Sequence, residues 1–201
     1  MTKKWAVAVL AAGKGSRLKV DTPKPILPIC GRPMIHYVLD AFKSFSKECF
    51  LGVVVGHEKE QVRSSTQTGC NNIEFAIQQD LNGTAGALKS FFKDCPKALE
   101  YKYLIVSCAD TPLLDSSILE KSEDYFSQNP STSGVALSFK TGTPFGLGRI
   151  IRGEKGFKIV EEKDATEEER KIQEVNSGLY ILEMSYVKAV SYTHLTLPTK
   201  A

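Results

Sequence analysis

Apolar segments rich in β-branched residues alternate along the chain with segments whose apolar residues recur at helical spacing. The strand-like segments are residues 6–10, 50–55, 73–77, 103–107, 135–139, 157–160 and 179–182. The helix-like segments are residues 33–45, 59–65, 86–92 and 116–126. Strands that are apolar along their whole length are typical of parallel sheets covered by helices on both faces. The pattern therefore predicts a three-layer α/β fold with a mostly parallel sheet.

Capping signals predict where several helices begin. Ser116 or Ser117 is a suitable cap for the helix that follows, and Thr84 is a suitable cap after a tight turn. Thr166 and Glu169 have the spacing of a capping box, which predicts a short exposed helix in a highly charged segment.

Two glycine-containing segments in the last third of the chain are open to two interpretations. Residues 142–156 contain several glycines with Arg149 and Arg152, and form either a mobile hairpin or a loop that closes over a ligand. Residues 176–178, Asn-Ser-Gly, precede the last apolar strand. They either make a turn or present an amide to a ligand.

Composition excludes several classes of protein. The 201 residues suffice for one domain with a core, and 42% hydrophobic and 24% charged residues are ordinary for a globular protein. A net charge of +3 is too small to indicate a nucleic-acid or membrane partner, and no apolar run would span a bilayer. The first apolar run is very short, so it predicts a core strand rather than a signal peptide. Five cysteines without CxxC spacing predict free thiols in the cytoplasm.

A glycine-rich, basic segment follows the first predicted strand. Gly13 and Gly15 allow backbone N–H groups to approach an anion, and Lys14, Arg17 and Lys24 add positive charge nearby. By themselves these residues fit a phosphate site and a tight turn with solvated cations about equally well.

Two further segments follow predicted strands. Asp110 comes directly after the strand of residues 103–107, at the sheet edge where the glycine-rich loop also lies. Its carboxylate suits Mg²⁺, or Asp110 is a turn or helix-capping residue before Pro112, which is the commoner case for such a residue in isolation. Gln78 and Gly83 lie between a strand and a helix, and the glutamine amide could recognise the edge of a base. The residues alone favour helix capping for this second segment.

Taken together, the segments resemble the sugar nucleotidyltransferases. Within that superfamily they are most similar to the N-terminal pyrophosphorylase domain of bacterial bifunctional UDP-N-acetylglucosamine pyrophosphorylase/glucosamine-1-phosphate N-acetyltransferases. LAAGKGSR at residues 10–17 and PK at residues 23–24 mark the superfamily, and KDAT with IQEVNSG, at residues 163–166 and 172–178, marks this enzyme. The resemblance covers about residues 5–182 and implies a Rossmann-like nucleotidyltransferase fold.

The resemblance implies a Mg²⁺-dependent uridylyltransferase that converts UTP and N-acetylglucosamine 1-phosphate to UDP-N-acetylglucosamine and pyrophosphate. The protein then positions the substrates and neutralises charge. The resemblance places Arg17 at the departing pyrophosphate, Lys24 at the reacting phosphates and Asp110 at Mg²⁺. It implies that the nucleotide is lined by Leu10, Ala11, Ala12 and Gly13. It implies that uracil is recognised by Gln78, Gly83 and Thr84, and that the sugar is bound by Gly148, Glu161 and Asn176.

The chain departs from the family pattern in three places. Cys108 and Ala109 replace the usual Tyr-Gly before the metal-binding aspartate, which alters the floor beneath the substrate. Residues 83–87 read GTAGA where the family has a GTGHA-like segment. The second metal ligand of the family, an asparagine, and the acetyltransferase β-helix have no counterpart in this chain.

The last residues predict a truncated domain. Residues 190–201 have no counterpart in the family, and the first ten resemble a translated adapter used in DNA library preparation. We therefore expect a nucleotidyltransferase domain at residues 1–189, incomplete at its C-terminus, followed by a non-native tail. The family trimer is built mainly by the β-helix, so the resemblance leaves a monomeric fragment open.

Alternative functions remain at this point. Another sugar-phosphate nucleotidyltransferase, making dTDP- or CDP-linked products, would share most of the motifs, but IQEVNSG argues against it. A truncated fragment that binds nucleotide without turnover is the second alternative. A dinucleotide-dependent oxidoreductase is disfavoured because Leu18 stands where its fingerprint requires a third glycine.

Overall fold

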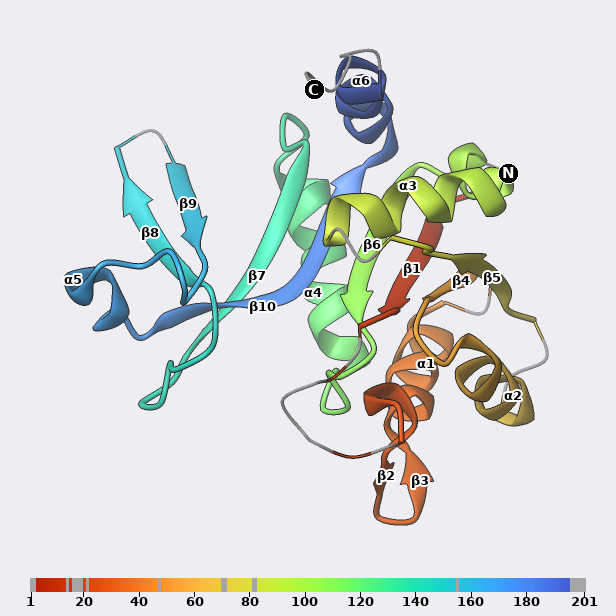
Figure 1. Cartoon of the computed structure of the whole chain (residues 1–201). Coiled ribbons are helices and arrows are strands. Elements are labelled where there is room, and N and C mark those ends of the chain that lie inside the picture. Colours follow the sequence, from red (N-terminus) through yellow and green to blue (C-terminus); the bar gives the residue numbers. More distant parts are fainter. Residues whose placement is uncertain are drawn as a thin grey trace. The chain divides into compact units, whose positions relative to one another are not determined.

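The computed structural model describes residues 3–13, 15, 20, 22–46, 48–69, 72–80, 83–154 and 156–195 (Figure 1). The chain forms two compact units. The first consists of Met1–Gly134 with Ile181–Ala201, and the second of Val135–Tyr180. Within the described part of the chain, no helix combines the length and apolarity that a bilayer crossing needs.

A parallel sheet forms the centre of the first unit. Its strands are β1 (Trp5–Ala11), β4 (Phe50–Val55), β5 (Glu74–Ile77) and β6 (Tyr103–Cys108), in the spatial order β5-β4-β1-β6. Each neighbouring pair is parallel. The central strand β1 is buried along nearly its whole length, as its continuous apolar sequence predicts. The α/β class and the mostly parallel sheet are thereby confirmed.

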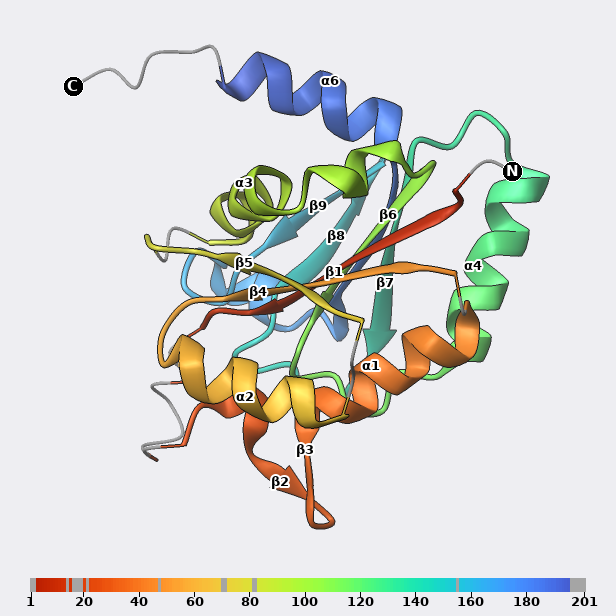
Figure 2. The same ribbon diagram turned by 90° about the vertical axis from the view of Figure 1, so that its right-hand side faces the viewer.

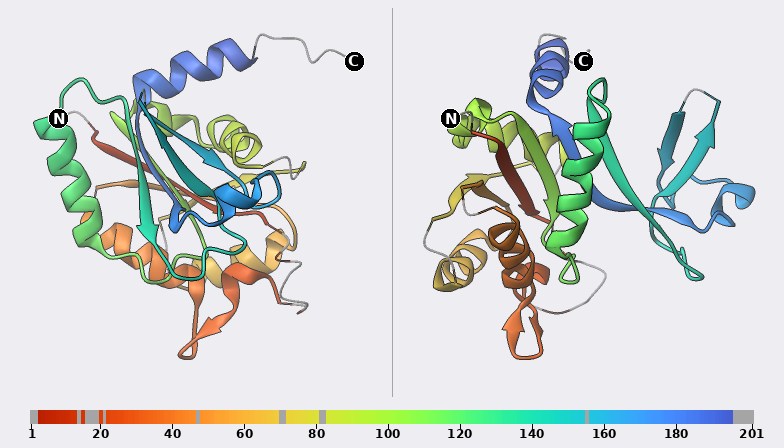
Figure 3. Two further views of the ribbon diagram at one scale, coloured as in Figure 1. Left: turned by 90° about the vertical axis from the view of Figure 1, so that its left-hand side faces the viewer. Right: turned by 180° about the vertical axis from the view of Figure 1, so that it is seen from behind.

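Helices cover both faces of this sheet. Helix α3 (Thr84–Asp94) covers one face, and α1 (Met34–Phe45) and α2 (Lys59–Gly69) cover the other (Figure 2). Helix α4 (Ser116–Gln128) packs against α1 (Figure 3, left). The unit also contains the 3₁₀ turns η2 (Lys24–Ile26) and η3 (Pro96–Glu100), the hairpin of β2 (Pro28–Ile29) and β3 (Arg32–Pro33), and helix α6 (Met184–Leu195).

Two predicted helix caps are wrong. The N-cap of α4 is Asp115, whose Oδ1 accepts a hydrogen bond from the backbone N–H of Ser117 at 2.8 Å. Ser116 and Ser117 are instead the first helical residues. Thr84 is likewise the first residue of α3, and its N-cap is Gly83, with φ of 89° and no side-chain cap. Asp is as good a cap as Ser, so sequence preference did not separate the neighbouring positions at α4.

The second unit is built from antiparallel strands. Strands β8 (Arg149–Gly153) and β9 (Gly156–Val160) form a hairpin, seen as the adjacent cyan and blue arrows in Figure 3 (right). Strand β10 (Glu174–Glu183) pairs with β8 and with β7 (Gly134–Lys140). The short helix α5 (Glu167–Arg170) carries the predicted capping box, with both hydrogen bonds present.

The glycine-rich segment and the polar triplet of the second unit both belong to strands. Part of residues 142–156 forms β8, so the segment is a hairpin strand and its approach. Residues 176–178 lie inside β10, which begins at Glu174, so they do not make a turn before the strand. Residues 174–178 are mostly polar, so their composition resembles that of a loop. The apolar pattern therefore placed the start of this strand at Leu179 instead of Glu174.

A glycine in β4 gives a first testable prediction. A Cβ at Gly52 would lie 2.4 Å from Cε2 of Phe91, which is fully buried and packs edge-on against Phe92. Gly52→Ala should therefore destabilise the chain by about 1–3 kcal/mol through overpacking, measured by denaturant unfolding. Adding Phe91→Leu should recover part of that loss. If the changes in the free energy of unfolding of the two single variants simply add in the double variant, the predicted contact between residues 52 and 91 would be contradicted.

Candidate functional site

The ends of β1 and β6 bring two predicted site loops together. The strands run parallel with Leu10 opposite Cys108, and the N–H of Ala109 donates to the carbonyl of Leu10 at 3.0 Å. Ala11 and Ala12 are buried at this edge, whereas Gly13 is exposed. The loops therefore leave the sheet from adjacent points, as predicted. Lys14 and Arg17 lie outside the described residues.

The glycine-rich loop approaches Lys24 closely. Gly15 has a φ of +60°, and a Cβ there would lie 3.0 Å from Cβ of Lys24. Lys24 begins η2, whose N-cap is Pro23 and which has Pro25 in its first turn. Because proline fixes φ, the two prolines restrict the backbone that carries the lysine. Glycine at position 15 therefore meets both a conformational and a steric requirement.

Lys24 and Asp110 form an ion pair. Nζ of Lys24 donates to Oδ2 of Asp110, and the two side chains are 39% and 37% exposed. Helix α4 is capped by Asp115, so Asp110 does not serve as its cap. The chain thus places an accessible cation and an accessible carboxylate in contact at the sheet edge where β1 and β6 end.

The donor set at Asp110 fits a magnesium ion that substrate helps to hold. Magnesium is usually bound through one or two carboxylates together with substrate phosphates, and it keeps several waters. Among the described residues there is no group of three or more His, Cys, Asp or Glu side chains that could hold a metal. Asp110 would supply one protein oxygen, and phosphate oxygens would supply others.

Cys108 is not equipped to act as a nucleophile. Burial, and after it the charge of Asp110, raise the pKa of its thiol to about 11, although the charge of Lys24 opposes this shift. A thiol with this pKa is protonated at neutral pH, and the thiolate is the nucleophilic form. The site therefore lacks covalent chemistry at Cys108. Among the described cysteines, Cys30, Cys95 and Cys108 are free, as predicted.

The structure brings Gln78 and Gly83 together. Gln78 is only 5% exposed, and its Nε2 donates to the carbonyl of Gly83 at 3.2 Å. A Cβ on Gly83 would meet nothing within 4 Å, so the backbone there is open to a ligand. Thr84 follows as an exposed residue at the start of α3. The amide of Gln78 thus holds the backbone of Gly83, the N-cap of α3.

A hollow of about 570 Å³ lies at the carboxyl ends of β4 and β5. Gln78 and Gln79 line it on one side, and residues 56–60 line it on the other. Sequence reasoning did not single out residues 56–60. Their position directly after β4, at the ligand-binding edge of a parallel sheet, is the signal that could have identified them.

The three predicted sugar residues meet in the second unit. A Cβ at Gly148 would lie 3.3 Å from Oε1 of Glu161 and 3.6 Å from Cβ of Asn176. The N–H of Asn176 donates to the carbonyl of Gly148 at 2.8 Å. The absence of a side chain at position 148 therefore leaves a small space beside a carboxylate and an amide, both suited to sugar hydroxyl and N-acetyl groups.

Tyr180 is a residue of this cluster that sequence reasoning missed. Nδ2 of Asn176 donates to the hydroxyl of Tyr180 at 2.6 Å, and Oδ1 of Asn176 accepts from the N–H of Gly178 at 3.1 Å. These two bonds set the orientation of the amide. Residues four apart on a strand lie on one face, so the spacing of Asn176 and Tyr180 was the available signal.

Glu174 links three strands of the second unit and gives a pH-dependent prediction. Arg152 donates to both of its carboxylate oxygens, at 2.9 and 2.6 Å, and Ser138 donates at 2.6 Å. These bonds lower the pKa of Glu174 to about 2, and the bond from Arg152 has the largest effect.

A carboxyl group with a lowered folded-state pKa stabilises the fold above its unfolded pKa and loses that contribution as the pH falls. The free energy of unfolding lost by Glu174→Gln should therefore be largest above about pH 4.5 and should disappear towards pH 2. Denaturant unfolding of both chains across this range measures the difference. A difference independent of pH would contradict the prediction.

Comparison with known families adds to this geometry. The model of the MobA-like NTP transferase domain matches residues 7–172. This chain belongs to the MobA-like NTP transferase domain family. The matched range contains the glycine-rich segment after β1 (residues 12–17, the β1 loop), Lys24 and Asp110. It also contains Gly148 and Glu161, two of the three residues predicted to bind the sugar.

Curated relatives of this NTP transferase domain carry the name bifunctional protein GlmU. The protein of Bacillus subtilis strain 168 is 41% identical over 190 residues, which cover 91% of this chain and 39% of the relative. That of Fervidobacterium nodosum is 39% identical over 183 residues, covering 90% of this chain and 38% of the relative. The chain thus spans about two fifths of the length of these relatives.

Solved structures share the fold of the NTP transferase domain. A UDP-glucose pyrophosphorylase complexed with UDP-glucose matches with a TM-score of 0.69 at 18% identity, covering 94% of this chain and 80% of the other. The 4-diphosphocytidyl-2C-methyl-D-erythritol synthase of Anaerococcus prevotii matches with a TM-score of 0.66 at 13% identity, covering 100% and 80%. At these identities the likeness concerns the fold alone.

Proposed function

We propose that this NTP transferase domain transfers uridylyl from UTP to N-acetylglucosamine 1-phosphate and releases pyrophosphate. The observation that carries the proposal is the contact of Lys24 with Asp110 beside the β1 loop. It supports a phosphate-binding role for Lys24 and a metal-binding role for Asp110 at the sheet edge where β1 and β6 end. The similarity to GlmU proteins, at about 40% identity over most of this chain, supports the choice of nucleotide and sugar.

The chemistry is an in-line displacement at the α-phosphorus of UTP. The phosphate oxygen of the sugar phosphate forms the new P–O bond, and the bond to the β-phosphate bridging oxygen breaks. Bound Mg²⁺ would supply charge neutralisation at the phosphates, and Asp110 would hold it. Lys24 binds phosphate oxygens at the reacting end, and we assign Arg17 to the departing pyrophosphate. The protein contributes position and charge rather than a covalent intermediate.

The nucleotide contacts are proposed on the first unit. Leu10, Ala11, Ala12 and Gly13 line the nucleotide, with Cys108 and Ala109 on the adjacent strand end. Gln78, Gly83 and Thr84 recognise uracil, and the order that Gln78 gives to Gly83 supports this role.

The sugar contacts are proposed on the second unit, at Gly148, Glu161 and Asn176. Their mutual proximity supports the assignment. The carboxylate of Glu161 would accept hydrogen bonds from sugar hydroxyls, and the amide of Asn176 would bind the N-acetyl group. A reducing compartment such as the cytoplasm is supported by the free cysteines among the described residues.

A matrix of substrates tests the proposal. The chain is incubated with Mg²⁺, each of UTP, dTTP and CTP, and each of N-acetylglucosamine 1-phosphate and glucose 1-phosphate. Pyrophosphate release should be greatest for UTP with N-acetylglucosamine 1-phosphate. Preference for another pair would assign a different sugar-phosphate nucleotidyltransferase. Calorimetric binding of UTP without pyrophosphate release would assign a nucleotide-binding chain without turnover.

A further inference from the structure

Arg149 has the largest fully buried side chain among the described residues, with 1% of its surface exposed. Burying a guanidinium is costly unless the charge is paired and its N–H groups are hydrogen-bonded. Arg149 begins β8, directly after Gly148, and the proposed reaction assigns it no role. Its partners therefore decide what it does.

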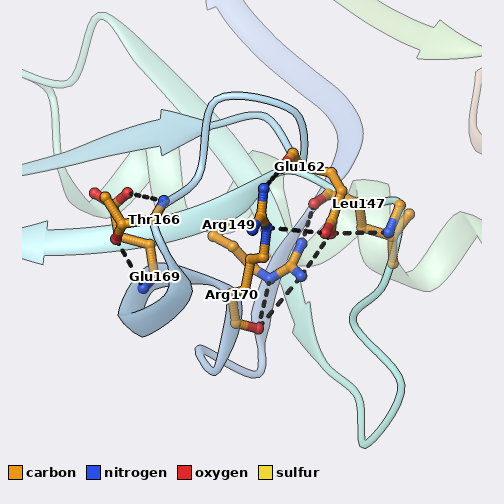
Figure 4. A network of polar contacts seen from close by, with 7 residues as sticks. Leu147, Arg149, Glu162, Thr166, Glu169 and Arg170 are labelled. Atoms are coloured by element: carbon orange, nitrogen blue, oxygen red, sulfur yellow. Dashed lines mark hydrogen bonds and ion pairs between the residues drawn. The ribbon is translucent and has the colours of Figure 1, made fainter.

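The guanidinium joins three segments of the second unit (Figure 4). Nη2 donates to Oε2 of Glu162 at 2.7 Å, and Nη1 donates to the carbonyl of Leu147. Nε and Nη2 also lie 3.4 and 3.3 Å from the carbonyl of Arg170. The side chain of Arg170 returns to Glu162, with Nε 3.4 Å from Oε1.

Glu162 also holds the backbone before Gly148. Its Oε2 accepts a hydrogen bond from the N–H of Gly146 at 2.9 Å, in addition to the bond from Arg149. These contacts lower the pKa of the Glu162 carboxyl group. The hydrogen bond from Arg149 has the largest effect, and the bond from Gly146 the next largest. The carboxylate therefore stays ionised at neutral pH, which keeps both bonds charge-assisted.

Three successive backbone positions are fixed as a result. The N–H of Gly146 is bound by Glu162, the carbonyl of Leu147 by Arg149, and the carbonyl of Gly148 by the N–H of Asn176. Arg149 is opposite Val160, the last residue of β9, and Glu161 and Glu162 follow Val160 directly after the strand. The network therefore ties down the approach to Gly148 and the segment that carries Glu161.

We propose that Arg149 and Glu162 are positioning residues of the sugar site, which hold Gly148 and Glu161 at the spacing that the sugar phosphate requires. This inference rests on the function proposed above. Neither residue needs to touch substrate, because each acts through the backbone of its neighbour. A preformed site avoids the cost of ordering its groups when the ligand binds.

Amide hydrogen exchange in the full chain, without ligand, tests the network first. In Glu162→Ala the amide of Gly146 should exchange at least about tenfold faster than in the wild type, because its acceptor is lost. In Glu168→Ala, which removes an exposed carboxylate from the same unit, exchange at Gly146 should be unchanged. An unprotected Gly146 amide in the wild type, or equal exchange in Glu162→Ala, would overturn the inference.

Ligand binding tests the positioning role. With Mg²⁺ and UTP present, the affinity for N-acetylglucosamine 1-phosphate should fall about tenfold in Glu162→Ala, the scale of a lost charged hydrogen bond. Affinity for UTP should stay within about twofold. Glu162→Gln keeps an oxygen for the Gly146 amide and should recover part of the sugar-phosphate affinity. Thermal unfolding of each variant shows that the chain remains folded.

The outcomes separate the two proposals. Unchanged affinity for the sugar phosphate, or equal losses for it and UTP, would overturn the positioning role while the proposed function stands. A wild-type chain that binds neither UTP nor N-acetylglucosamine 1-phosphate would instead contradict the proposed function. The positioning role would fall with it, and the exchange result would then describe only a structural network.

Discussion

Replacing Asp110 with asparagine should lower the rate of pyrophosphate release by about 1,000-fold. The proposed metal-binding carboxylate follows β6 directly, contacts Lys24 and caps no helix. Neutralising it removes the protein's charge on the metal, and metal stabilisation of the transferring group contributes several kcal/mol, of which each ~1.4 kcal/mol is a factor of ten in rate. Turnover with UTP and N-acetylglucosamine 1-phosphate at saturating Mg²⁺ measures the effect.

Asp115→Asn is the matched control for this substitution. Asp115 is five residues further along and caps α4 through Oδ1, and asparagine caps a helix equally well. Its rate should therefore stay within about twofold of the wild type. Binding of Mn²⁺ in the presence of UTP, followed by electron paramagnetic resonance, adds a readout independent of turnover. Asp110→Asn should weaken that binding, and undiminished Mn²⁺ binding would remove Asp110 from the metal site.

Lys24→Met should lower the rate of turnover by about 100-fold, with a smaller loss of UTP affinity. The lysine supplies a cation beside the β1 loop, and removing one preorganised donor to developing charge typically costs about 10²–10³ in kcat. The unequal effect is expected because charge develops at the reacting phosphates in the transition state. Methionine keeps the length of the side chain and its packing against Gly15.

Lys89→Met provides the comparison. Lys89 is an exposed residue of α3, so the same change in charge and shape there should leave turnover within about twofold of the wild type. Steady-state kinetics and calorimetric UTP binding separate rate from affinity. Equal losses of rate and affinity in Lys24→Met would assign Lys24 to uniform nucleotide binding rather than to the reacting phosphates.

Much of the first unit followed from local pattern. The continuous apolar segments of β1, β4 and β6 predicted buried parallel strands because no position along them could face water. The edge shared by the β1 loop and Asp110 followed from the same pattern, since parallel strands present their carboxyl ends together. The capping box of Thr166 and Glu169 was also predictable because both its bonds lie within one turn.

Other features depended on partners distant in sequence. Strand β8 and the first half of β10 carry polar and glycine residues, and only pairing between strands makes them part of a sheet. The cap of α4 was a choice between adjacent polar residues that propensity does not separate. The role of Arg149 was likewise invisible, because an arginine before an apolar strand is usually exposed.

The sequence by itself determined the α/β class, the β1 loop with its basic residues, and the chemical identity of the groups proposed to bind phosphate, metal and sugar. Those properties follow from the spacing of apolar residues along the chain and from the chemistry of the side chains, neither of which depends on long-range contacts. Only the tertiary structure decided that Lys24 pairs with Asp110, that Gly148, Glu161 and Asn176 meet, and that a buried arginine fixes the approach to Gly148. Each of these joins segments separated along the chain, and strand register and packing bring them within contact distance.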